Sequence, residues 1–297
     1  MKSYKSVDFA YAKVNLHLSV GPRRQDGYHS ILSIFQKIDL HDTLVIEACQ
    51  GEKFSFSLEG LTLQESTIEQ AGRLFCEEAK LPLKLKVRCV KRIPYASGLG
   101  GGSSDAATTL MMLNALFGDL ISTDRLLELG ESIGSDVPFF MSGASAAIVS
   151  GRGEIVEPLA KRTPFYGLLI TPLEKETSTR EAYATLDAIR GEVGAFPTKE
   201  ALLKSYYGPL ATWNFYNDFR LVADRTDPLY GALDKAIKGE ESIFSLLSGS
   251  GSAYCIFSEK EAIIDRLGQK IGEIRGDIAI KRIKSLHTDH SDVTVSV

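Results

Sequence analysis

Residues 93–118 read IPYASGLGGGSSDAATTLMMLNALFG, and this stretch decides how the rest of the sequence is interpreted. Four of the five residues from 98 to 102 are glycine, and two serines and an aspartate follow directly. Glycine loses more backbone freedom on folding than any other residue, so such a cluster is costly to order. Four glycines in five positions exceed what a turn requires, which indicates that the backbone approaches a ligand here.

The glycine stretch lies between a predicted strand and a predicted helix. Alternating apolar residues over 83–89 predict the strand, and the apolar spacing over 103–117 predicts the helix. The first N–H groups of a helix have no intrahelical partner, and the helix dipole favours an anion there. Glycines let the backbone turn several N–H groups toward a phosphate. We therefore predict a phosphate site formed by Gly98, Leu99, Gly100, Gly101, Gly102, Ser103 and Ser104.

Two familiar phosphate-binding motifs do not fit this stretch. A Walker A loop is excluded because no Gly-Lys-[Ser/Thr] follows the glycines. The dinucleotide fingerprint needs a third glycine at the position that Ser103 occupies. It also needs an acidic residue at the end of a second strand about 20 residues further on, but Glu128, at about that distance, lies within a predicted helix. The alternative interpretation of the glycine stretch is a tight turn that binds no ligand. Asp105 suits the helix dipole but would repel a bare phosphate, so it faces away or a Mg²⁺ ion lies between.

Length and composition limit the possible classes of protein. The chain has 297 residues, enough for two domains, and 44% hydrophobic with 24% charged residues is ordinary for a soluble protein. A net charge of −4 argues against a general nucleic-acid partner. Without a long apolar run or an apolar leader, we expect no membrane partner and a cytoplasmic location. The four scattered cysteines indicate reduced thiols rather than zinc ligands.

Strands and helices alternate irregularly, which favours an α+β fold over a doubly wound sheet. Residues 12–20 alternate, with Lys13, Asn15, His17 and Ser19 predicted to share one face of a strand. A turn is predicted at Asp26–Gly27, and a helix over 122–134 that is capped by Ser122 or Thr123 and ends near Gly134. A boundary near residues 155–165 gives two domains, 1–160 and 161–297. In the second half the pattern predicts a strand at 165–171, helices at 178–190, 198–207, 219–238 and 259–270, strands flanking Gly249 and Gly251, and a final strand at 277–286.

The segment PYASGLGGGSSDAA (94–107) resembles the phosphate loop of the GHMP kinases, which include galactokinase, homoserine kinase and mevalonate kinase. Further segments resemble motifs of that family in the same order: AKVNLHLSV (12–20), DGYHSI (26–31), GSDVPFF (134–140), STREAY (178–183) and LSGSGSAYCIF (247–257). DGYH together with AKVNL points to the branch whose acceptor is a cytidylated methylerythritol. The chain departs from this branch at Ser66–Ile68, where relatives contact adenine, and at Phe219–Arg220.

The resemblance implies a fold and a set of roles. The fold is a ribosomal-protein-like N-terminal domain followed by a ferredoxin-like C-terminal domain. Lys13 and Asp136 become the catalytic pair, and Gly249 and Gly251 form a second glycine loop beside the phosphate loop. The acceptor would be bound by Asn15, Tyr28, His29, Thr177 and Ser178.

Residue patterns alone leave other interpretations open for these side chains. Lys13 and Asn15 lie two apart, about 6.6 Å along a strand, but a lone lysine there is more often solvated at an edge. Asp136 precedes Pro138, which also suits a helix N-cap. A Tyr28–His29 pair is more often surface packing, although an aromatic ring can stack on a nucleobase.

The resemblance implies an ATP- and Mg²⁺-dependent kinase that phosphorylates the tertiary 2-hydroxyl of its acceptor in the non-mevalonate isoprenoid route. The metal ligands stay unassigned. Two alternatives are another GHMP kinase with a small alcohol acceptor, and a nucleotide-sensing relative without catalysis. The presence of both Lys13 and Asp136 argues against the second. The expected partners are small-molecule substrates, and the expected assembly is a monomer or weak homodimer.

Overall fold

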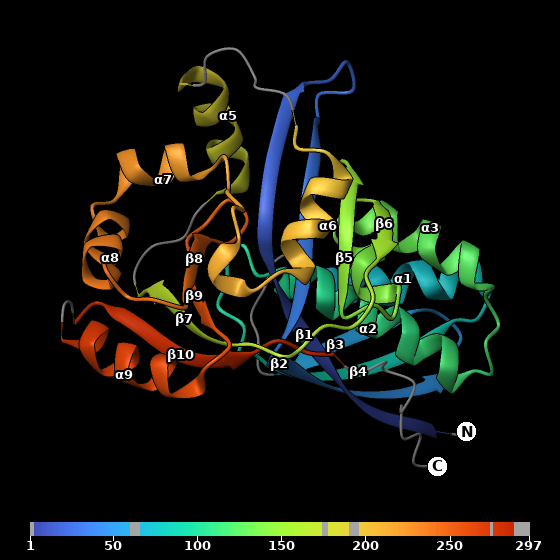
Figure 1. The fold of residues 1–297 in the computed structure, drawn as a ribbon. Coiled ribbons are helices and arrows are strands. Elements are labelled where there is room, and N and C mark those ends of the chain that lie inside the picture. The colour runs from blue at the N-terminus through green and yellow to red at the C-terminus, as the bar shows by residue number, and fades with distance from the viewer. Residues whose placement is uncertain (1–2, 60–65, 174–177, 190–195, 274–275, 288–297) are drawn as a thin grey trace.

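The strands form two sheets, one in each half of the chain (Figure 1). The structure, a computed structural model, describes residues 3–59, 66–173, 178–189, 196–273 and 276–287. In the first sheet the order is β3-β4-β2-β5-β6, β1 also pairs with β2, and β3 runs parallel to β4. Its strands are β1 (Ser3–Arg23), β2 (His29–Gln50), β3 (Ser55–Glu59), β4 (Leu83–Val90), β5 (Ala146–Gly151) and β6 (Ile155–Pro158).

Helices of the first half cluster beside this sheet (Figure 1) and pack mainly on one another and on β1. They are α1 (Thr67–Glu78), α2 (Gly101–Leu116), α3 (Thr123–Ile133) and α4 (Val137–Met141). The helix predicted after the glycines begins at Gly101, two residues earlier than expected. Ser122 caps α3 by accepting a hydrogen bond from the Arg125 N–H, and the helix ends before Gly134, both as predicted.

The second half follows a strand-helix-strand-strand-helix-strand pattern around an antiparallel sheet of order β10-β7-β9-β8. This is the ferredoxin-like arrangement that the resemblance implied. Its strands are β7 (Tyr166–Pro172), β8 (Phe244–Leu247), β9 (Tyr254–Ser258) and β10 (Ile278–Lys284). Its helices are α5 (Thr179–Ile189), α6 (Lys199–Tyr207), the 3-10 turn η1 (Leu210–Thr212), α7 (Arg220–Thr226), α8 (Leu229–Ile237) and α9 (Glu261–Gly272).

The helix predicted over 219–238 is in fact two helices, α7 and α8. The break falls at Asp227–Pro228. Proline has no N–H to donate and its ring clashes with the preceding turn, so it starts a helix more readily than it continues one. In the described part of the chain, no helix is both long and apolar enough to cross a bilayer.

Strands β1 and β2 form a long hairpin that runs between the two halves (Figure 1). The predicted turn at Asp26–Gly27 is confirmed: the Arg24 N–H donates to the Tyr28 carbonyl at 2.6 Å, and Gly27 has a φ of +85°. Leu18 and Val20 of β1 also bond to the second half, through the Tyr216 carbonyl and the Asp218 carboxylate. The sheets change between β6 and β7, and the domain boundary placed there stays a prediction.

Because of a bulge in β1, the side chains that share a face of this strand differ from those predicted from alternation. Asn15 pairs with Phe35 and His17 with Ile34, so Leu16 is an extra residue in the strand. An extra residue reverses which face the following side chains occupy. Lys13 and Asn15 therefore face one side of the sheet, whereas His17 and Ser19 face the other. The prediction that all four share one face is wrong.

His17 is buried at the junction of the two halves. Its Nδ1 accepts from the Tyr216 N–H at 3.4 Å, so Nε2 carries the proton and donates to the Ser19 hydroxyl at 2.8 Å. Burial lowers the pKa of His17 to about 4, because the charged imidazolium would lose its hydration. The folded protein therefore holds this imidazole neutral.

We predict that acid weakens the fold through His17. Below pH 6.5 the unfolded chain binds a proton at His17 that the folded protein binds only near pH 4, so stability falls as the pH falls through this window. The shift corresponds to about 3 kcal/mol at pH 4. Urea unfolding at pH 7 and pH 4 should show a smaller loss in His17→Gln, whose amide both donates and accepts without titrating. An equal loss in both proteins would contradict this role.

Candidate active site

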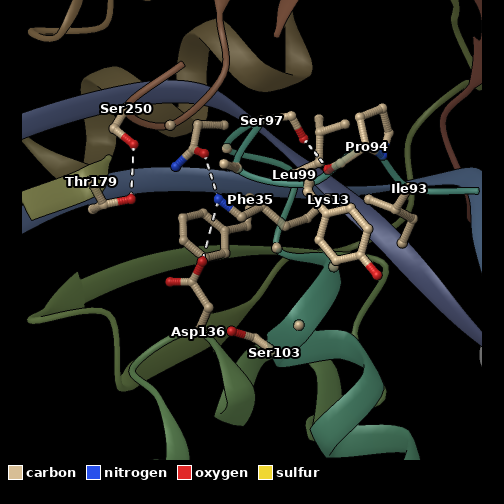
Figure 2. A pocket seen from close by; sticks show the side chains of 18 of the residues that line it. Lys13, Phe35, Ile93, Pro94, Ser97, Leu99, Ser103, Asp136, Thr179 and Ser250 are labelled. Carbon is tan, nitrogen blue, oxygen red and sulfur yellow. Dashed lines mark hydrogen bonds and ion pairs between the residues drawn. The ribbon is translucent and has the colours of Figure 1, made fainter. Parts of the chain in front are cut away.

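A cavity of about 370 Å³ lies where the glycine loop, β1 and the second half meet (Figure 2). From the first half it is lined by residues 93–103, Lys13, Asn15, Phe35 and Asp136. Thr179, Tyr183, Phe219, Gly249 and Ser250 line it from the second half. The structure thus brings together most of the residues that the sequence analysis singled out.

The glycines of the loop differ in whether the packing around them requires a glycine. Gly98 and Gly100 have φ values of +78° and +72°, and a Cβ would lie 2.2 Å from the Ser248 carbonyl or 2.9 Å from the Phe140 ring. Both positions demand glycine whether or not a ligand binds. At Gly102, by contrast, a Cβ would meet Thr67 at 3.6 Å, an ordinary contact. Packing therefore does not explain why position 102 is a glycine, whereas the close approach of a ligand would.

The N-terminus of α2 opens onto the cavity. Its first intrahelical bond runs from the Ser104 N–H to the Gly100 carbonyl at 2.9 Å, so the N–H groups of Gly101, Gly102 and Ser103 have no intrahelical partner. Ser103 lines the cavity. Ser104 does not, because the next position of a helix faces a different direction. It is buried and donates its hydroxyl to the Tyr11 carbonyl at 2.7 Å, so the prediction of Ser104 as a phosphate ligand is wrong.

Asp105 faces away from the cavity, which is one of the two possibilities left open by the sequence. Its carboxylate bonds the Lys91 ammonium at 2.7 Å, and Lys91 also pairs with Asp42. Burial raises the pKa of Asp105, Asp42 raises it further, and the Lys91 charge opposes both. Asp42 additionally accepts hydrogen bonds from the backbone N–H groups of Arg92 and Ile93. This cluster fixes the end of β4 from which the glycine loop departs.

Lys13 is almost completely buried, with 3% of its surface exposed. Its ammonium donates to Asn15 Oδ1 at 2.6 Å, lies 3.4 Å from Asp136 Oδ2 and sits 4.4 Å above the Phe35 ring centre (Figure 2). The interpretation of Lys13 as a solvated lysine is therefore excluded. The two side chains that the resemblance implies as the catalytic pair lie within ion-pair distance.

Asp136 occupies the N-cap position of α4, but its side chain makes no capping hydrogen bond there. The carboxylate instead points to Lys13 and reaches the cavity, with 29% of the side chain exposed. The backbone completes the arrangement, because the Lys13 N–H donates to the Leu99 carbonyl at 3.0 Å. Strand β1, the glycine loop and the start of α4 are thereby held together.

The second glycine loop packs directly on the first. A Cβ at Gly249 would lie 3.0 Å from Gly98 Cα, and a Cβ at Gly98 would lie 3.2 Å from the Gly251 carbonyl. The Ser248 hydroxyl accepts from the Asn15 N–H at 3.2 Å and donates to the Gly98 carbonyl at 3.2 Å. The second loop therefore lies where the resemblance placed it.

The residues predicted to bind the acceptor do not all line the cavity. Asn15 does, whereas His29 is buried, bonds the Gly21 carbonyl at 2.9 Å and stacks on Tyr183 with ring centres 4.9 Å apart. Tyr28 is 52% exposed in an adjoining groove, beneath the Arg152 guanidinium. Arg152 lines both the groove and the cavity, which connects them.

The segment before α5 gives a mixed outcome. Thr177 lies outside the described residues. The Ser178 hydroxyl caps α5 by accepting from the Glu181 N–H at 3.3 Å. The neighbouring Thr179 lines the cavity and bonds the Ser250 hydroxyl at 3.2 Å.

Sequence reasoning missed several residues that shape the cavity. Tyr183 is the last residue of the STREAY segment, and the sequence analysis gives it no role. It nevertheless lines the cavity, between His29 and Phe219. Phe35 of β2 and Arg152, in the turn between β5 and β6, carried no signal, because a single aromatic or arginine is ordinary. Phe35 reaches the cavity because it pairs with Asn15 across the sheet, and Arg152 reaches it from that turn.

Comparison with known proteins agrees with this architecture. Residues 66–144 match the model of the GHMP kinases N terminal domain. Among solved structures, homoserine kinase from Cytophaga hutchinsonii is 16% identical, with a TM-score of 0.64 covering 96% of this chain and 95% of that one. At this identity the likeness defines the fold, which is that of the GHMP kinases.

More similar relatives define the branch. A 4-diphosphocytidyl-2-C-methyl-D-erythritol kinase of Treponema pallidum is 37% identical over 265 residues, 86% of this chain and 90% of the relative. One from Thermotoga petrophila is 38% identical, covering 82% and 89%. A crystal structure of 4-(cytidine 5'-diphospho)-2C-methyl-D-erythritol kinase is 30% identical with a TM-score of 0.76, covering 93% and 98%. The chain belongs to the 4-diphosphocytidyl-2-C-methyl-D-erythritol kinase family.

We predict that Gly102→Val weakens phosphate binding without disturbing the fold. Among the described residues, an added Cβ at this position would meet only Thr67, and valine is a better helix former than glycine. Its methyl groups, however, would obstruct the N–H groups at the start of α2. The affinity for inorganic tripolyphosphate, measured by calorimetry, should fall about tenfold or more. Gly231→Val in α8, where a Cβ would meet none of the described atoms within 4 Å, is the control. Unchanged affinity in Gly102→Val would remove the proposed role of the loop.

Proposed function

We propose that this chain transfers the γ-phosphoryl group of ATP to the 2-hydroxyl of 4-diphosphocytidyl-2-C-methyl-D-erythritol, a step of the non-mevalonate route to isoprenoid precursors. One observation carries the proposal: the pair of buried Lys13 and partly exposed Asp136 opens onto the same cavity as the N-terminus of α2. Phosphoryl transfer mainly requires positioning and cancellation of charge on the transferred group. The cavity offers both within one space.

The glycine loop and α2 would bind the phosphates of ATP. The N–H groups of Gly101, Gly102 and Ser103 supply donors in a fixed arrangement, and the helix dipole adds positive potential. Thr67, Lys91 and Tyr95 line the cavity together with this loop and leave room for the rest of the nucleotide. Because Thr67 bonds the Gly102 carbonyl at 2.9 Å, α1 and the loop would respond to the same ligand.

Lys13 and Asp136 would act on the acceptor hydroxyl. The hydroxyl oxygen attacks the γ-phosphorus, the bond from that phosphorus to the β,γ-bridging oxygen breaks, and ADP leaves. Asp136 accepts the hydroxyl proton, and the Lys13 ammonium stabilises the charge that develops on the transferred group. Asn15 and Phe35 hold Lys13 in place without competing for the proton.

The residues present fit a Mg²⁺ ion brought in with ATP. Mg²⁺ prefers oxygen ligands and is usually held by one or two protein groups together with substrate phosphates. Ser103 and Asp136 offer such oxygens on the same side of the cavity (Figure 2). In the residues that the structure describes, there is no group of three or more acidic, His or Cys side chains that could hold a metal without the nucleotide. When bound, the ion would neutralise negative charge between the β- and γ-phosphates.

The cytidine end of the acceptor would lie along Tyr28, His29 and Tyr183. Tyr28 presents an exposed ring, and the Tyr183 ring is fixed between His29 and Phe219. Aromatic rings of this kind stack on nucleobases. ADP release measured with the cytidylated acceptor, with free methylerythritol and with neither tests the whole proposal. Release that is independent of the cytidine would favour another GHMP kinase activity, and no release would favour a non-catalytic nucleotide-binding role.

Asp136→Asn tests the chemical step. We expect turnover to fall by roughly 10²–10⁴-fold, because the amide keeps the shape of the side chain but cannot accept the proton. The KM values should change much less, since the loss belongs to the transition state, and adding Lys13→Met should cost little more. Asp124→Asn on the exposed side of α3 is the control. Near-normal turnover in Asp136→Asn would refute the assigned role.

Tyr28→Ala tests the acceptor site. The loss of one stacked ring should weaken acceptor binding by roughly 1–3 kcal/mol, about 5- to 150-fold in Kd. ATP binding should be unchanged, because Tyr28 lines the adjoining groove, whereas the glycine loop lines the cavity. Tyr207→Ala removes an exposed tyrosine of α6 as the matched control. Equal losses for both substrates would show that Tyr28 is structural.

A further inference from the structure

A second cavity, of about 210 Å³, lies behind α2 on the side away from the active site. We call it the rear cavity; its walls come from β1, Lys37 of β2, α2 and α4. Its wall is mostly apolar, with Met111 and Leu116 of α2 and Phe140 and Met141 of α4. Exposed residues at its rim, among them Phe9, open it to solvent.

The rear cavity contains one buried cation, Lys37, which is 4% exposed. An ammonium group has three donors. In the described residues, its hydrogen bonding amounts to a 3.4 Å bond to the Phe140 carbonyl, and no carboxylate lies within ion-pair distance. The Phe139 ring lies 5.4 Å below the charge. Burial lowers the pKa of Lys37 to about 8, as expected for a charge with too few partners.

Neither the proposed reaction nor the fold accounts for this charge. Replacing a buried, poorly paired charge by an apolar side chain generally costs nothing or stabilises a protein. Lys37 would therefore be an unfavourable feature unless something neutralises it. An apolar cavity with a single buried donor group at one end is the usual form of a small-molecule site.

We propose that the rear cavity is a second ligand site, which binds a small monocarboxylate with a short hydrocarbon tail. The carboxylate would pair with Lys37, and the tail would pack on Met111, Leu116 and Met141. A single positive charge matches a monoanion. Asp8, which also lines the cavity, would repel a dianionic phosphate more strongly than a monoanion.

The size of the rear cavity sets the length of the tail. An apolar cavity of about 150 Å³ holds benzene. The rear cavity is larger and would hold about eight heavy atoms, the size of hexanoate.

The position of the rear cavity connects it to the active site. Phe140 lines the rear cavity, and its ring lies 2.9 Å from where a Cβ on Gly100 would be. Ser104 also lines it, one residue after Ser103, which lines the active site. A ligand in the rear cavity would therefore contact the residues that support the glycine loop.

Calorimetry and ligand-observed NMR on the full chain test the proposal, with hexanoate, 1-hexanol and hexyl phosphate as probes. Hexanoate should bind about tenfold or more tightly than hexanol, the difference expected for a charge-assisted bond, and more tightly than hexyl phosphate. Lys37→Met should reduce hexanoate to the affinity of hexanol, whereas Lys84→Met, at an exposed lysine of β4, should change nothing.

A second variant guards against a folding defect in Lys37→Met. Met111→Trp keeps the charge but fills the rear cavity, and it should abolish binding of both hexanoate and hexanol. Equal affinities for hexanoate and hexanol, unchanged hexanoate binding in Lys37→Met or Met111→Trp, tighter binding of hexyl phosphate, or no binding of hexanoate at all would each overturn the proposal.

Discussion

The arrangement of this molecule depends on the burial of one ammonium group, that of Lys13. A charge removed from water costs several kcal/mol unless its partners are well placed. Here the partners come from three elements: Asn15 lies on the same strand, Phe35 on the neighbouring strand β2, and Asp136, more than 100 residues further along the chain, at the start of α4. The charge is therefore stable only when the hairpin, the first sheet and α4 are assembled. Lys13 thus links the stability of the first half to the geometry of its site.

The same strand serves the second half because of the bulge at Leu16. Before the bulge, Lys13 and Asn15 face the active site, and after it His17 and Ser19 face the segment around Tyr216. Without the extra residue, all these polar side chains would crowd one face, and the contacts with Tyr216 would be lost. The two glycine loops then meet where β1 passes between the halves, since Asn15 and Gly98 both bond the Ser248 hydroxyl.

Features governed by local sequence could be predicted, and those governed by pairing could not. Period-2 alternation, the Ser122 cap, the Asp26–Gly27 turn and the strand-to-helix glycine loop follow from nearby residues and were predicted correctly. The bulge at Leu16 depends on which residue of β2 lies opposite, which alternation does not encode. The direction of the Ser104 side chain depends on where α2 begins. Because the predicted helix began two residues too late, this side chain was assigned to the wrong side of the helix. The separation of Lys13 and Asp136 was accessible only through the family resemblance.

The charges around the glycine loop support the proposal that its backbone binds the phosphates. Lys91 lines the cavity at this loop, but Asp42 and Asp105 already neutralise it, and Lys13 is occupied by Asn15 and Asp136. A polyphosphate entering here would therefore find lysines whose charges are already compensated. The remaining positive potential comes from the N–H groups and dipole of α2, which neither titrate nor move. In the proposed mechanism this places the demand on Gly102, whose missing side chain keeps those N–H groups open. Once Asp136 has accepted the proton, the charge of Lys13 would be left to stabilise the negative charge that develops.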